Sequence, residues 1–232
     1  MKFEIKNIVL VLCSLFLVLT SCEVIPESER LIPVQTGIQR HVLLEFTGFR
    51  CVNCPAAAET AANLKHLYGD SLIVLALHPA SNPFTQGAYD YTCPEADSIY
   101  QLLGGLPTTP FPTGSIDMRL FDDSYFISPA DWATKLTTNH KFEIINHQSL
   151  DTSYWLVEDS VLGVQAMPDG TVNTAYYHRQ VLRAISAEPF TSIPDTYDAS
   201  HCTIVTIYSD PTDKHIVNAY ETTFDSFFDS QP

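Results

Sequence analysis

Basic residues are scarce in this sequence. Of its 232 residues, 12 are Lys or Arg and 27 are Asp or Glu, which gives a formal net charge of −15. Nucleic-acid binding needs cations clustered against the phosphates, and so few cations spread along an acidic chain do not supply such a cluster. We therefore expect no nucleic-acid partner.

The signatures of nucleotide and metal sites are absent as well. The sequence has no GxGxxG motif and no glycine-rich phosphate loop, so we expect no nucleotide substrate. It has a single C-x-x-C pair with no second pair to complete a zinc site, and its eight histidines show no ligand spacing. We expect neither a metal nor an organic cofactor. The hydrophobic fraction of 45% is sufficient for a packed core.

A short apolar run near the N-terminus predicts an export signal. Residues 8–19 follow Lys2 and Lys6 and are largely apolar, but the run is shorter than the roughly 20 residues that span a bilayer. The Leu-Thr-Ser-Cys sequence at 19–22 resembles the bacterial lipobox, which implies cleavage after residue 21 and acylation of Cys22, for example by palmitate. The alternative is an ordinary signal peptide followed by a chance cysteine.

These features together predict a cell-envelope lipoprotein. We expect a signal peptide at 1–21, an acidic tether at 22–40, and a lipid anchor on Cys22 that holds the protein at the outer membrane, on its periplasmic face or at the cell surface.

The segment 41–78 predicts a β-α-β unit with two cysteines at its turn. Residues 41–47 and 71–78 are apolar runs typical of buried parallel strands, and the Ala-rich segment 55–68 between them is typical of a helix. Pro55 suits the first helical turn and Gly69 the position after the last. Cys51 and Cys54 thus lie at a helix N-terminus, which favours the thiolate form.

This order of strand, C-x-x-C, helix and strand resembles a thioredoxin-like domain, which we place at 41–140. The resemblance implies that Glu45, six residues before Cys51, is the buried carboxylate that moves a proton to or from Cys54. It also implies that Pro112, just before the strand-like run 113–118, is the cis-proline that positions a substrate. Residues 79–104 form an insertion, and Ser128 is expected to cap a helix that contains Trp132 and Leu136.

Two readings of the cysteine pair remain open. In the first, Cys51 is the more exposed nucleophile of a thiol–disulfide exchanger and Cys54 resolves the mixed disulfide. In the second, the pair is a permanent structural disulfide in a non-catalytic binding or adhesion module. The remaining cysteines, Cys93 and Cys202, form either a long-range disulfide or two buried unpaired thiols.

Residues 141–232 predict a small antiparallel β-rich domain, sandwich-like in type. We expect 153–157 to pair with 161–165, a turn at 168–170, a strand at 181–185, and a hairpin of 202–208 with 216–224. The aromatic and basic cluster 176–179 is either a binding surface or, as we favour, a strand that packs against the first domain.

The segments LLEFTGFRCVNCP at 43–55, LVEDSVLGVQ at 156–165 and YYHRQVLRA at 176–184 resemble the outer membrane protein 28-related lipoproteins. That resemblance implies an acylated envelope protein with a thioredoxin-like domain followed by a β-rich domain. It implies an envelope protein as a partner, and it implies no particular reaction.

Overall fold

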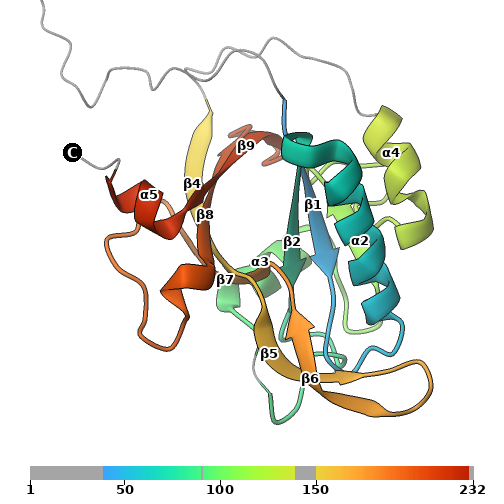
Figure 1. Cartoon of the computed structure of the whole chain (residues 1–232). Coiled ribbons are helices and arrows are strands. Elements are labelled where there is room, and N and C mark those ends of the chain that lie inside the picture. Colours follow the sequence, from blue (N-terminus) through green and yellow to red (C-terminus); the bar gives the residue numbers. More distant parts are fainter. Residues whose placement is uncertain (1–38, 90, 139–149, 230–232) are drawn as a thin grey trace, which may run out of the picture. The chain divides into compact units, whose positions relative to one another are not determined.

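The computed structural model describes residues 39–89, 91–138 and 150–229, which form a mixed α/β fold (Figure 1). The expected signal peptide, Cys22 and nearly all of the tether lie outside these residues. No helix among the described residues combines the length and the apolar character needed to cross a bilayer.

The β-α-β unit is present as expected. Strands β1 (His41–Phe46) and β2 (Leu72–Leu77) are buried along their whole length and pair in parallel, with His41 opposite Leu72. Between them lies α2 (Cys54–Tyr68), which has Pro55 in its first turn and ends at Gly69, whose φ of 55° suits glycine. A 3-10 turn, η2 (Gly69–Ser71), leads into β2.

Both faces of β1 are covered because its side chains alternate between two layers. Val42, Leu44 and Phe46 join a core cluster that includes α3 (Pro94–Leu102), while Leu43 packs with α2 and α4 (Trp132–Thr138). In Figure 1, α2 and α4 lie beside the strands on one face, with α3 behind. Glu45 shares the α2 face with Leu43, which places a carboxyl group beneath this helix.

The next elements also match the expectation. The bond Phe111–Pro112 is cis, and β3 (Thr113–Ile116) follows it and pairs antiparallel with β1. Ser128 caps η3 (Pro129–Asp131), since its hydroxyl accepts a hydrogen bond from the Ala130 N–H, and α4 continues directly.

The C-terminal strands extend the first sheet. They are β4 (Asp151–Glu158), β5 (Val161–Ala166), β6 (Val172–His178), β7 (Val181–Ser186), β8 (Cys202–Ser209) and β9 (Ile216–Thr223), with η5 (Ala199–His201) before β8 and α5 (Phe224–Asp229) at the end. The large sheet has the order β3-β1-β2-β7-β4-β8-β9, and β5 and β6 form a separate two-stranded sheet. The expected hairpin of β8 and β9 is confirmed, as is the turn at Gly170, whose φ is 82°.

The predicted pairing of 153–157 with 161–165 is wrong. The buried strand β4 pairs on one side with β7 and on the other with β8, so neither edge is free for β5. Strand β5 is only half-buried and pairs with β6. A short connection between two apolar runs usually predicts a hairpin. Here β4, the more buried of the two, lies between β7 and β8 in the larger sheet instead.

The expected boundary near residue 140 does not separate two sheets. Ala76 of β2 lies opposite Val181 of β7, and the Ala76 N–H donates to the Gln180 carbonyl oxygen at 2.8 Å. The described residues all fall in one compact unit. Because β7 covers the edge that β2 would otherwise expose, the C-terminal strands do not form a sandwich of their own.

Asp117 ties the last strand to the first. His41 Nδ1 lies 2.7 Å from Asp117 Oδ2, the Val42 N–H donates to Asp117 Oδ1 at 2.7 Å, and the Ile216 N–H donates to the Asp117 carbonyl oxygen at 2.8 Å. The Asp117 side chain is 2% exposed, so water cannot replace these partners.

We predict that Asp117→Ala lowers the free energy of unfolding by about 3 kcal/mol, because it removes the carboxylate contacts of the buried His41 imidazole and the buried Val42 N–H. The matched control is Asp151→Ala, which breaks an exposed ion pair with Lys214 and should cost under about 1 kcal/mol. Urea unfolding measures both values, and equal losses would contradict the assignment.

Candidate functional site

The disulfide lies at the start of α2 and is buried. Cys51 and Cys54 are joined, and each residue is 2% exposed. The expectation that Cys51 is the more exposed of the two is therefore wrong. A helix N-terminus is usually open to solvent, but here two distant segments cover it.

The insertion covers the loop that carries Cys51 on one side. The Arg50 N–H donates to the Phe84 carbonyl oxygen at 3.0 Å. Gly48 permits this close approach, since a Cβ atom there would lie 2.5 Å from the same oxygen. The backbone of the loop is thus already paired with its own chain.

The second sheet covers the same loop on the other side. The Ala166 N–H donates to the Phe49 carbonyl oxygen at 2.7 Å, and Gln165 Nε2 donates to the Cys51 carbonyl oxygen at 2.8 Å. Gln165 is itself 2% exposed. We call residues 47–53 the cysteine loop, and these contacts with Phe84, Gln165 and Ala166 the clamp.

Pro112 lies beside the same buried cluster. Phe111, the residue that shares the cis bond with it, packs in one core cluster with Cys51 and Cys54. The Phe111 ring stacks on Phe84 of the insertion with a centroid distance of 6.0 Å. The structure therefore places Phe111 in the cluster that holds the cysteines and against the insertion, while Pro112 itself is half-buried.

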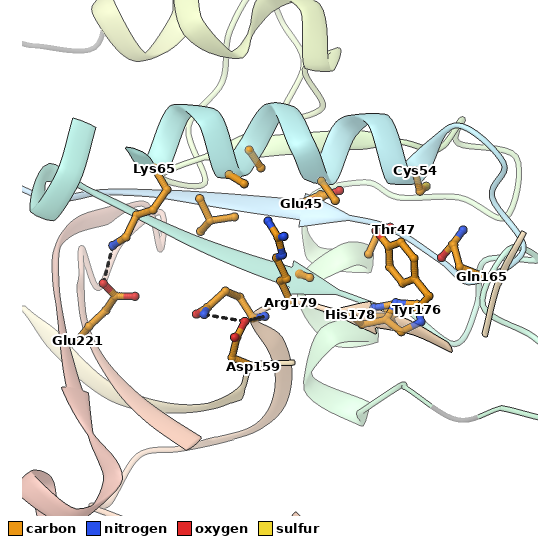
Figure 2. A pocket seen from close by; sticks show the side chains of 17 residues that line it. Glu45, Thr47, Cys54, Lys65, Asp159, Gln165, Tyr176, His178, Arg179 and Glu221 are labelled. Carbon is orange, nitrogen blue, oxygen red and sulfur yellow. Dashed lines mark hydrogen bonds and ion pairs between the residues drawn. The ribbon is translucent and has the colours of Figure 1, made fainter. Parts of the chain in front are cut away.

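A cavity of about 250 Å³ lies beneath α2 (Figure 2). Small side chains of α2 and β2 form its apolar wall, and Arg179 and Tyr176 point toward α2 from the opposite side. Its lining combines Cys54, Glu45, Thr47, Ala58, Ala61, Ala62, Lys65, Val74, Ala76, His78, Asp159, Gln165, Tyr176, His178, Arg179, Gln180 and Glu221. The predicted site residues Glu45 and Cys54 therefore share one cavity.

Glu45 is a buried carboxyl group with an unused oxygen. It is 3% exposed, and its Oε1 has no hydrogen-bond partner among the described residues. Burial raises the pKa of Glu45 to about 8, so the group is largely protonated at neutral pH. A protonated carboxyl group can both donate and accept a hydrogen bond.

Two imidazoles complete the polar part of the cavity. His78 is 1% exposed, and neither ring nitrogen has a hydrogen-bond partner among the described residues. Burial, reinforced by His178 and Arg183, holds the pKa of His78 well below its usual value. Burial also lowers the pKa of His178 to about 4, while its Nε2 lies 3.1 Å from the Val164 carbonyl oxygen. Both rings are therefore neutral at pH 7.

His78 is a cavity residue that the sequence did not single out. Its one signal was a polar residue at the end of a buried apolar run. The cluster 176–179 divides between two roles: Tyr176, His178 and Arg179 line the cavity, whereas Tyr177 points outward and is 58% exposed.

Cys93 and Cys202 are not joined. Both are buried free thiols, and burial raises the pKa of each to about 11. Cys93 packs in the core cluster around α3, whereas Cys202 packs with Leu156 and Ile204 in a cluster beside α5. Of the two alternatives that the sequence left open, the structure has the unpaired thiols.

One group of side chains in the described part of the chain is close enough to share a metal ion. Ligand atoms of Asp210, Asp213 and His215 lie within 4.8 Å of one another. Asp210 already accepts from the Thr212 N–H, and Asp213 already contacts His215 Nδ1. These contacts account for the turn between β8 and β9, and we assign no metal to it.

Comparison with known proteins shows similarity at the level of the fold. No family model matches the chain, and no curated protein matches it. The solved structure of HBP35 of Porphyromonas gingivalis is 15% identical, with a TM-score of 0.58 over 81% of this chain and 76% of that one. A structural-genomics target from Agrobacterium tumefaciens is 13% identical, with a TM-score of 0.49 over 81% of this chain and 96% of its own. At such identities a shared fold does not carry a shared function.

The pKa of Glu45 predicts a pH dependence of stability. Its folded value of about 8 exceeds the ordinary 4.5, so the folded state binds the extra proton and stability falls as pH rises between these values. His78 and His178, with lowered pKa values, act in the opposite sense, and their effect ends as the pH rises past the ordinary 6.5 by about one unit. From pH 6.5 to 8 the Glu45 effect is the larger, and the protein should lose about 1 kcal/mol of unfolding free energy.

Urea unfolding at several pH values tests this expectation, with Glu45→Gln as the comparison. The variant keeps a neutral donor and acceptor, so its stability should not fall over the same range. A parallel decline in both proteins would show that another group is responsible.

Proposed function

We propose that this protein is an envelope-anchored binding module on a thioredoxin-like scaffold, with Cys51–Cys54 as a structural disulfide. The observation that carries the proposal is the 2% exposure of both cysteines beneath the clamp. Exchange requires an incoming thiolate to reach a disulfide sulfur. Each cysteine residue is almost fully buried here, which opposes such an approach from the protein surface.

The scaffold part of the proposal has support from sequence and structure. The order β1, C-x-x-C, α2, β2 and the cis-proline before β3 are typical of thioredoxin-like domains, and the likeness to HBP35 extends over 81% of the chain. The resemblance to the outer membrane protein 28-related lipoproteins is supported only by the three sequence segments at 43–55, 156–165 and 176–184.

Thiol–disulfide exchange is the second candidate, and one observation favours it. Glu45 and Cys54 line the same cavity, and Glu45 is protonated at neutral pH. An external thiolate would attack the Cys51 sulfur to form a mixed disulfide, and Cys54 would leave as a thiolate and take the proton from Glu45. The clamp would have to open first, with loss of its hydrogen bonds to the cysteine loop.

A glutathione titration of the Cys51–Cys54 pair decides between the candidates. For a structural disulfide we expect a reduction potential below about −300 mV, and for an exchanger one between about −120 and −270 mV. The Cys51→Ser protein gives the background of the assay. A second readout is the rate of reduction by dithiothreitol, which Glu45→Gln should slow only if Glu45 supplies the proton.

The envelope anchor is a separate part of the proposal, and its residue, Cys22, lies outside the described residues. The lipobox-like sequence supports it. We expect Cys22→Ala to abolish labelling by radioactive palmitate and to release the protein from the membrane fraction. Cys13→Ala, within the expected signal peptide, is the matched control and should leave labelling intact. Labelling that persists in Cys22→Ala would contradict the anchor.

A further inference from the structure

The cavity under α2 holds buried polar groups with unused hydrogen-bonding capacity. Glu45 and His78 are 3% and 1% exposed, and Glu45 Oε1 and both His78 ring nitrogens have no hydrogen-bond partner among the described residues. Burying such groups unpaired is costly, and native structures normally satisfy them. Two unsatisfied groups lining one cavity indicate a ligand that satisfies them.

The two groups lie close to each other on one face of the sheet. Glu45 is opposite Ala76 in the parallel pair, and His78 comes two residues after Ala76, so its side chain returns to the same face. Both residues line the cavity along with Ala76. A ligand that fills the cavity can therefore contact both.

The size and walls of the cavity suit a ring. A cavity of 150 Å³ is known to hold benzene, so about 250 Å³ admits one substituted ring. Its apolar wall consists of small side chains, which leaves a smooth surface. The residues are Ala58, Ala61 and Ala62 of α2 with Val74 and Ala76 of β2.

The charges around the cavity balance. Lys65 Nζ lies 2.6 Å from Glu221 Oε2, and the other two ionised lining groups are Arg179 and Asp159. Glu45, His78 and His178 are uncharged at pH 7. With two cations and two anions, the cavity offers no net charge to compensate a buried ion, so a neutral ligand is favoured.

We propose that this cavity binds a small neutral ring compound of the carboxamide or lactam class, with its polar edge toward Glu45 and His78. An amide edge presents a carbonyl acceptor beside an N–H donor. A protonated carboxyl group presents the matching donor and acceptor, so Glu45 can form two hydrogen bonds with that edge. This inference rests on the proposed binding function and names the class of ligand for it.

Three compounds of nearly equal shape test the ligand class: neutral benzamide, anionic benzoate and cationic benzamidine. Each is titrated into the oxidised full-length protein at pH 7, with backbone amide NMR shifts of β1 and α2 as the readout. We expect benzamide to bind with a dissociation constant of about 1 mM or tighter, the range for a ligand of about nine heavy atoms. The two charged compounds should bind at least tenfold more weakly.

Variants of α2 test the location. Ala62→Leu projects into the cavity and should weaken benzamide binding at least tenfold, whereas Ala56→Leu on the exposed side of α2 should leave it unchanged. Glu45→Gln keeps a donor and an acceptor and should retain binding within about threefold, while Glu45→Leu should lose it. The thermal unfolding midpoint of each variant shows that it is folded.

Several results would overturn the proposal. If benzoate or benzamidine binds more tightly than benzamide, a neutral ligand class is excluded. If Ala62→Leu and Ala56→Leu weaken benzamide binding equally, the cavity is excluded as the site. If benzamide up to about 10 mM causes no NMR shift, a site of this kind is excluded. The redox titration is independent of these outcomes. If benzamide binds and the reduction potential lies in the range of exchangers, only the structural role of the disulfide is refuted. If the potential is below that range and benzamide does not bind, only the ligand proposal is refuted.

Discussion

The clamp on the cysteine loop is the constraint that sets the surroundings of the Cys51–Cys54 disulfide. Hydrogen bonds from Arg50 to Phe84 and from Ala166 to Phe49 hold the loop between two segments that are far apart in the sequence. These contacts pair backbone groups of the loop with the protein's own chain, and Cys51 and Cys54 are each 2% exposed. A motif associated with disulfide exchange therefore lies in a setting that favours a stable disulfide.

The same clamp creates the cavity. Because β5 and β6 are anchored at the cysteine loop, Tyr176 and His178 are held opposite α2 instead of packing into the large sheet. The space left between them is lined by Glu45 and His78; Glu45 Oε1 and both His78 ring nitrogens have no hydrogen-bond partner among the described residues. Burial keeps both groups uncharged, and the ionised groups that line the same cavity are two cations and two anions. The proposal of a neutral ligand rests on this balance.

Local sequence patterns correctly predicted those elements that depend on residues close together in the chain. Apolar runs of β-compatible residues, an Ala-rich helix with Pro55 at its start, and turn residues such as Asp169 and Gly170 act within a few residues, so β1, α2, β2 and the β8–β9 hairpin appear where expected. Which strands pair with each other depends on residues that are far apart in the sequence. The pairing of β4 with β7 and β8, and the joining of β2 to β7, depend on which surfaces bury each other best.

The sequence by itself determined the residues available for chemistry: the cysteine pair at the start of α2, the carboxyl group on β1 and the cis-proline before β3. Tertiary structure alone decided their environment. It buried Cys51 as deeply as Cys54, left Cys93 and Cys202 apart in separate clusters, and brought His78 and His178 to Glu45. The physical reason is that exposure and pKa are set by groups that are close in space, and those groups come from segments up to about a hundred residues away in the chain.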